Sequence, residues 1–279
     1  MKKILYLLLF LSSSLYVNAG IPKRIITLSA ALTETADALG FGKNIVAVDV
    51  TSMYPAFVNK LPKVSNNRSV SAEGLIAFAP DLVLAPEGSV SKEIQYQLKS
   101  AGIRFVGIKQ EYSVAGALMF IRTVAAALQS APKGEILAKQ TEIKIKQSLT
   151  TIKTAGKIPK VLFIYARGTG TMLVAGKKTS MDAIITLSGG KNAVQEFNEF
   201  KPYTTEALIK ANPDVILMFE FGYNSLGGIN SILKMPGVGQ TTAGKNKKIV
   251  QMDADLLVNF SVRLDQAITA LNNKINSGL

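Results

Sequence analysis

The chain has 279 residues, a formal net charge of +13 and neither histidine nor cysteine. These absences exclude disulfides, thiolate metal sites and the Ser-His-Asp or Cys-His arrangements of many hydrolases, so that a zinc site would depend on carboxylates alone. The excess of lysine and arginine is either a solvated surface or a field that attracts anionic ligands. Nucleic acid is not an expected partner, because no basic run is interleaved with aromatic residues.

Residues 1–19 have the features of a secretory signal peptide. The basic Met1-Lys2-Lys3 precedes a compact apolar run, and Val17-Asn18-Ala19 places small residues before a cleavage point. The apolar run is too short to cross a bilayer, and no cysteine is present to accept a lipid anchor. We expect a free, unlipidated protein of the periplasm. Its charge falls by two, from +13 to +11, when Lys2 and Lys3 leave.

Residues 20–131 alternate between strand and helix patterns. Such alternation is typical of a parallel sheet covered by helices on both faces, which is the α/β fold class. The expected elements are strands at Arg24–Leu28, Ile45–Asp49, Leu82–Ala85 and Arg104–Ile108, and a helix at Ala31–Leu39 ended by Gly40.

Residues 132–156 are expected to connect two lobes. The apolar residues from Pro132 to Thr154 alternate with lysines and glutamates, which predicts a long amphipathic helix with one wet face. About 20 residues of helix would extend about 30 Å, enough to run along both lobes. A connector of this kind is stiff, and it predicts that the lobes open through small angles.

Residues 157–279 repeat the strand and helix alternation and are expected to form a second lobe. The expected strands are Val161–Tyr165, Val215–Phe219 and Lys248–Met252, with helices at Ser180–Leu187, at Thr204–Ala211 and from about Ser261 to the end. The whole chain is thus predicted to form two Rossmann-like lobes with central parallel sheets, joined by one long rigid helix.

One phrase occurs in both halves of the chain. Glu73 and Glu206 each open a short apolar helix pattern, and Pro80-Asp81 and Pro213-Asp214 follow at the same distance before a buried strand. The copies are 133 residues apart, which indicates two related lobes rather than a solenoid of short repeats. Two lobes imply a cleft between them.

These features together resemble the substrate-binding proteins of ABC importers for iron-siderophores, cobalamin and haem. The resemblance covers the whole mature chain and is strongest to periplasmic haem-binding proteins, with the class III periplasmic binding protein fold. It depends on an ordered set of stretches: Arg24–Leu28, Thr33-Glu34, Ala38–Gly40, Asp49–Pro55, Lys60–Val64, Arg68, Ala72–Gly74, Val161–Ile164, Ala175-Gly176 and Ala183–Gly190.

The resemblance implies a docking role for two glutamates. In this family one glutamate at the tip of each lobe enters arginine pockets of the membrane permease, and the matching positions are Glu73 and Glu206. Each lies in the first turn of a predicted helix, where a carboxylate is favoured by the helix dipole. The alternative is that each glutamate only stabilises its own helix.

The ligand residues of the family are only partly present. Haem-binding relatives carry an iron-coordinating tyrosine where this chain has Asn66, and some carry a second-lobe histidine where it has Arg167. Arg68, which lies beside the ligand in the family, is retained. A haem ligand would then need a substitute axial group, and Tyr165, two residues before Arg167, is the first candidate.

Several alternatives remain open at this stage. Tyr54, Tyr203 and Tyr223 also fall in loops that could face the cleft, and Glu87 follows a strand end where ligand loops gather. Arg68 and Arg167 could instead clamp a ferric siderophore or cobalamin. The transport role implies an ABC permease, its ATPase subunit and an upstream TonB-dependent outer-membrane receptor as partners, with haem as cargo and no catalytic cofactor. Two alternative functions are those of a secreted α/β enzyme and of a scaffold that binds no ligand.

Overall fold

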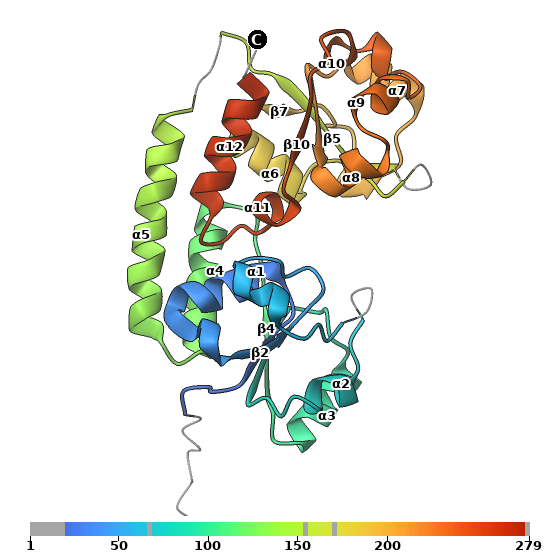
Figure 1. Ribbon diagram of the computed structural model, residues 1–279. Coiled ribbons are helices and arrows are strands. Elements are labelled where there is room, and N and C mark those ends of the chain that lie inside the picture. Colours follow the sequence, from blue (N-terminus) through green and yellow to red (C-terminus); the bar gives the residue numbers. More distant parts are fainter. Residues whose placement is uncertain (1–19, 66–68, 153–155, 169–171, 277–279) are drawn as a thin grey trace, which may run out of the picture.

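A computed structural model describes residues 20–65, 69–152, 156–168 and 172–276. Within these residues the chain forms two lobes, each built on its own β-sheet, and a long helix runs beside both of them (Figure 1). The predicted signal peptide, residues 1–19, lies outside the described part of the chain. No helix within that part combines the length and the hydrophobicity that crossing a membrane requires.

The first lobe contains a four-stranded, fully parallel sheet in the order β2-β1-β3-β4. Its strands are β1 (Ile25–Thr27), β2 (Ile45–Val48), β3 (Leu82–Pro86) and β4 (Arg104–Ile108). Alternate residues of β3 enter different cores, with Leu82 and Leu84 on one face and Val83 on the other. This strand is buried on both faces, which explains its unbroken apolar sequence.

Helices cover both faces of the first sheet. α1 (Ala30–Ala36) and α4 (Val114–Ala127) pack on the face that holds Leu84, whereas α2 (Ala72–Ile76) and α3 (Lys92–Ser100) pack on the face that holds Val83. After α1 the chain makes a π-helical turn, Asp37–Phe41, in which Gly40 has a φ of +90°. Only glycine adopts that angle without strain, so Gly40 ends this helix as the sequence predicts.

The connecting helix is α5 (Ala131–Thr150), and it contacts α4 of the first lobe and α12 of the second. A Cβ atom on Gly134 would lie 2.2 Å from the Cβ of Ala125, so the close approach of α5 to α4 requires glycine. At the other end, the hydroxyl of Ser148 donates to the backbone oxygen of Asp265. The helix ends at Thr150, whereas the sequence pattern extends it to Thr154. Residues 150–154 are mostly β-branched, and β-branched side chains lower the propensity for helix.

The second lobe contains a six-stranded mixed sheet, in which β5, β7, β9 and β10 are parallel. Its strands are β5 (Lys160–Ala166), β6 (Met172–Ala175), β7 (Lys191–Asn192), β8 (Phe200–Lys201), β9 (Val215–Phe219) and β10 (Ile249–Met252). β6 and β8 run antiparallel to their neighbours, so the prediction of a parallel centre is confirmed but the sheet is extended at one edge.

Helices also cover both faces of the second sheet. One core packs against α6 (Ser180–Leu187), α11 (Ala254–Val258) and α12 (Leu264–Asn276) and surrounds Phe163. The other packs against the short helices α7 (Thr205–Ala211), α8 (Glu220–Ser225), α9 (Ile229–Leu233) and α10 (Thr242–Lys245).

Candidate functional site

The carboxyl ends of strands from both sheets meet at the boundary between the lobes. Tyr112 follows β4, and its ring centroid lies 5.4 Å from that of Phe260 in the second lobe. Glu34, in the helix after β1, forms an ion pair with Arg263, which lies beyond β10. Open α/β sheets bind ligands in the loops beyond their strand carboxyl ends. The lobe boundary is therefore where a solute site is expected.

Tyr165 and Arg167, which the sequence puts forward as ligand residues, lie together at the carboxyl end of β5. The Nε of Arg167 donates a hydrogen bond of 2.7 Å to the Tyr165 hydroxyl. The same guanidinium lies 5.2 Å from the centre of the Phe221 ring, which comes from α8 just after β9. Strands β5 and β9 are paired in the sheet, and this pairing brings the three side chains to one place.

The surroundings of Tyr165 are apolar and partly open. Its ring packs edge-on against Phe219 and Phe221, at centroid distances of 6.2 and 5.9 Å. Phe221 and Met172 remain 39% and 40% exposed, and Met172 is paired with Ala166 across the sheet. An exposed aromatic surface with one arginine fits a flat apolar ligand that carries anionic groups. Sequence reasoning missed Phe221, although an aromatic residue two positions after a buried strand was a usable signal.

Tyr203 lies in a different environment. Its hydroxyl donates to a carboxylate oxygen of Glu196 at 2.7 Å, and its ring contacts that of Phe197. Burial, and then the neighbouring Glu196 carboxylate, raise the pKa of Tyr203. The structure thus pairs Tyr203 with an acid and Tyr165 with a cation. The phenol of Tyr223 packs into the second-lobe core.

The candidate ligand residues of the first lobe are Glu87, Asn66 and Arg68. Glu87 is exposed in the turn after β3, and its backbone N–H donates to the oxygen of Ile108 at the end of β4. This places Glu87 at the same edge of the sheet as the other loops of the lobe boundary. Asn66 and Arg68 lie outside the described residues.

A groove of about 960 Å³ lies between the Glu111-Tyr112 loop and the outer side of α6. Its lining includes Lys177, Lys178 and Lys191 but none of the Tyr165, Arg167 and Phe221 group. Among the described residues, no cluster of three or more acidic side chains is arranged to hold a metal ion.

Glu73 and Glu206 occupy equivalent positions in the two lobes. Ser71 and Thr204 cap their helices by accepting hydrogen bonds from backbone N–H groups, and each glutamate lies exposed in the first turn. The pKa of Glu206 is lowered by hydrogen bonds to its own backbone N–H and then to the Thr204 hydroxyl. Two exposed carboxylates are thus presented at matching positions of related helices.

The aspartates of the repeated phrase have a structural role that the sequence did not reveal. Asp81 accepts backbone N–H bonds from Lys23 and Arg24, just before β1. Asp214 accepts the backbone N–H of Lys160, at the start of β5, at 2.8 Å. The cationic side chain of Arg24 donates to the carbonyls of Phe78 and Ala79, just after α2, and that of Lys160 donates to the carbonyl of Ala211, the last residue of α7. The same local unit is therefore built twice, which supports related lobes.

Two α/β lobes that face each other through their strand ends, with one stiff connecting helix, define a binding protein that holds a solute between its lobes. The sequence matches the periplasmic binding protein family over residues 25–256, and the chain belongs to this family. This match confirms the resemblance to periplasmic substrate-binding proteins that the repeated phrase and the connecting helix indicated.

Solved structures of family members share this architecture. The apo periplasmic haem-binding protein RhuT from Roseiflexus sp. RS-1 is 36% identical, covers 91% of this chain and 97% of its own, and superposes with a TM-score of 0.87. The haem-binding protein HmuT is 27% identical over 91% of this chain and 84% of its own, with a TM-score of 0.83.

Curated relatives include binding proteins named for an ABC transporter and for vitamin B12. A substrate-binding lipoprotein of Bacillus subtilis, YvrC, is 30% identical over 257 residues, which are 91% of this chain and 80% of that protein. The vitamin B12-binding protein of Vibrio parahaemolyticus is 31% identical over 217 residues, 76% of each chain. Members of this family are substrate-binding proteins of ABC transporters, and a permease with an ATPase subunit is the corresponding partner.

Proposed function

We propose that this protein binds haem between its lobes in the periplasm and delivers it to an ABC-type inner-membrane importer. The observation that carries the proposal is the group formed by Tyr165, Arg167 and Phe221 at the lobe boundary. The haem-binding relatives support it, because their fold matches this chain over nearly its whole length. The protein itself performs no catalysis, and ATP is hydrolysed by a separate cytoplasmic subunit.

The chemistry of the group suits ferric haem. A phenolate oxygen is an established axial ligand of haem iron, and a cationic hydrogen-bond donor beside it stabilises its negative charge. Arg167 supplies that donor to Tyr165. The exposed ring of Phe221 offers a surface on which the macrocycle can stack. The guanidinium of Arg68 is a candidate partner for a propionate, since arginine meets carboxylates through two parallel hydrogen bonds.

In this proposal the second lobe supplies the iron ligand. The first-lobe tyrosine of the haem-binding relatives is Asn66 here, and an amide is a poor ligand for ferric iron. Tyr165 takes over the axial position, and Glu87 is the described first-lobe candidate for a contact with the ligand, at the carboxyl end of its sheet. Asn66 and Arg68 remain candidates from the sequence alone. Tyr203, whose hydroxyl is paired with Glu196, is assigned no contact with the ligand.

Cobalamin is the second candidate, because several curated relatives are vitamin B12-binding proteins. A corrinoid is also a large flat macrocycle, but it does not need a phenolate from the protein. A ferric siderophore is the third ligand of the same transport class. In each case Glu73 and Glu206 dock the loaded protein onto the permease.

The proposal places the protein in one transport route. An outer-membrane receptor of the TonB-dependent type supplies the ligand to the periplasm, and this protein carries it to the permease. The signal peptide is removed on export and no lipid anchor is attached, because the chain lacks cysteine. In this respect it differs from YvrC, which is a lipoprotein.

A thermal-shift panel separates the three ligands. Purified protein from residue 20 onward is heated with hemin, cyanocobalamin or a ferric siderophore, each at a range of concentrations. A ligand present at 100 times its dissociation constant stabilises the folded state by about 2.7 kcal/mol. Stabilisation by hemin alone supports the proposal, whereas stabilisation by cyanocobalamin without hemin assigns the corrinoid role.

A further inference from the structure

One short segment of the second lobe makes several contacts with the first lobe. This segment, residues 259–263, lies between α11 and α12 and supplies Asn259, Phe260 and Arg263. Phe260 meets Tyr112 edge-on, and Arg263 lies over the ring of Tyr54 at 4.1 Å. Both tyrosines belong to loops after first-lobe strands. The segment is thus the second-lobe half of a contact across the lobe boundary.

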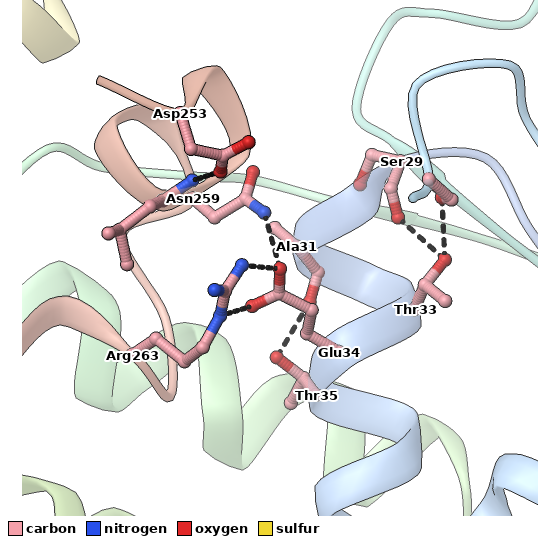
Figure 2. Close-up of polar contacts among 10 residues, drawn as sticks. Ser29, Ala31, Thr33, Glu34, Thr35, Asp253, Asn259 and Arg263 are labelled. Atoms are coloured by element: carbon pink, nitrogen blue, oxygen red, sulfur yellow. Dashed lines mark hydrogen bonds and ion pairs between the residues drawn. The ribbon is translucent and has the colours of Figure 1, made fainter. Parts of the chain in front are cut away.

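Glu34 is the buried centre of this contact (Figure 2). Its side chain is 1% exposed, and the Nε of Arg263 donates to one carboxylate oxygen at 2.8 Å. The other oxygen accepts from the terminal nitrogen of Arg263 and from Asn259 at 3.1 Å. The carboxylate is therefore held by the fork of the arginine and by an amide at the same time.

The helix that carries Glu34 is fully buried. All seven residues of α1 are buried, and the hydroxyls of Thr33 and Thr35 bond back to the carbonyls of Ser29 and Ala31. Figure 2 shows Arg263 and Asn259 converging on this helix from the second lobe. The pair therefore joins the segment 259–263 of the second lobe to a fully buried helix of the first lobe.

Burial acts on both charges of the pair. Burial raises the pKa of Glu34, while Arg263 and Asn259 counteract that rise. Burial acts to lower the pKa of Arg263, but the hydrogen bond to Glu34 and the charge of Glu34, together with Asp253 and Tyr54, raise it overall. Replacing one partner would leave the other charge buried without its counterion, which is far more costly than breaking an exposed pair. A buried pair of this kind selects one arrangement of the lobes.

We propose that Glu34 and Arg263 form a latch that fixes the separation of the lobes in the ligand-free protein, and so positions Tyr165 and Arg167 opposite the first lobe. The latch itself concerns the protein alone. The positioning of Tyr165 and Arg167 rests on the proposed ligand site. Glu34 and Arg263 are positioning residues, since neither needs to touch the ligand.

The absence of cysteine from the chain provides a clean distance measurement. Lys99→Cys in α3 and Lys245→Cys in α10 place two spin labels on exposed sites of different lobes, on the side away from α5 (Figure 1). Pulsed electron resonance then gives the distribution of distances between the lobes without ligand. The latch variants are Arg263→Met and Glu34→Gln. The matched control is Arg122→Met, which breaks the half-exposed Arg122–Glu135 pair between α4 and α5.

The latch predicts a broader distribution, shifted to longer distances, in both latch variants and an unchanged one in the control. A merely structural pair predicts lower melting temperatures with the wild-type distribution in every variant, and that result would overturn the proposal. If Arg263→Met fails to fold, Glu34→Gln decides alone, because it preserves side-chain volume and can still accept from Asn259. Combining Glu34→Arg with Arg263→Glu is expected to narrow the distribution again.

The positioning of Tyr165 and Arg167 by the latch is tested by measuring the hemin affinity of the same variants. If one molecule in ten has the binding-competent separation, the apparent dissociation constant rises about tenfold. If the hemin dissociation constant is unchanged in variants whose inter-lobe distance distribution is broadened, the latch does not position Tyr165 and Arg167. The latch itself would not be contradicted by that result. If the wild-type protein binds no hemin, the proposed ligand fails, whereas the distance measurement still decides the latch.

Discussion

Arg167 donates a hydrogen bond of 2.7 Å from its Nε to the hydroxyl of Tyr165, and both residues lie at the end of a strand that faces the lobe boundary. If Tyr165 is the axial ligand, Tyr165→Phe abolishes the visible absorption changes of an iron-bound phenolate and weakens hemin binding. Arg167→Met keeps the ligand but removes its supporting donor, which lowers affinity about 10- to 100-fold.

Tyr203→Phe is the matched control for this pair of variants. It removes a second-lobe hydroxyl whose partner is the Glu196 carboxylate. We expect the hemin spectrum and affinity of this variant to stay close to those of the wild type. Loss of the spectrum in Tyr203→Phe together with its retention in Tyr165→Phe would reverse the assignment of the ligand.

Glu73→Ala and Glu206→Ala are expected to abolish ligand import in cells when combined, while purified protein still binds ligand. Glu93 is the control, because it is also an exposed first-turn glutamate, in a helix capped by Ser91. If the glutamates only stabilise their helices, Glu93→Ala lowers stability to the same degree as the others. Import at the wild-type rate in the Glu73 and Glu206 double variant would refute docking.

The repeated aspartates are expected to contribute unequally to stability. Replacing Asp214 by Asn removes the charge from a side chain that is 9% exposed and bonded to the Lys160 backbone. We expect a loss of about 1 to 3 kcal/mol in the free energy of unfolding, measured with urea. Asp81→Asn is expected to cost less, because Asp81 is exposed. Equal costs, or a larger one for Asp81, would contradict this account.

Asp255 is expected to make stability depend on pH. Burial, then the nearby Asp253, Glu34 and Asp49, raise its pKa from 3.8 to about 7, although a backbone bond from Met53 opposes the rise. A carboxyl with a raised folded-state pKa stabilises the fold below the unfolded value, and this contribution is lost as pH rises toward 7. Lys63 is the cation that also interacts with Asp255 and Asp49.

The measurement compares urea unfolding of the wild type and Asp255→Asn between pH 4 and 8. The wild type is expected to lose stability relative to the variant as pH rises from 4 to about 7, and the difference should then level off. Asp37, whose pKa burial also raises, is present in both proteins and cancels in the difference. A difference that does not vary with pH would show that Asp255 ionises as it does in the unfolded chain.

Strong local patterns could be predicted from the sequence. The strands Arg104–Ile108 and Val215–Phe219 and the helix Ser180–Leu187 begin and end at the predicted residues. Each is a periodic or apolar run bounded by residues that favour turns or caps, so local preference and burial agree. The family expectation was confirmed for the same reason, since it depended on the order of such runs.

Contacts between distant residues could not be predicted. Glu34 and Arg263 are 229 positions apart, and nothing in either neighbourhood marks the other as its partner. The antiparallel strands β6 and β8 contain only four and two residues, too short for a periodicity to appear. Tyr165 and Arg167 were foreseeable because they are neighbours on one strand end, whereas Phe221 reaches them only through the pairing of β5 with β9.

Titration of the purified protein with hemin, followed by visible absorption, tests the central claim most directly. The account predicts a saturable spectral change with one hemin per protein at its endpoint, and loss of that change in Tyr165→Phe. A spectrum that grows linearly with added hemin and never saturates, in protein that cyanocobalamin or a ferric siderophore stabilises against heat, would contradict haem as the transported ligand.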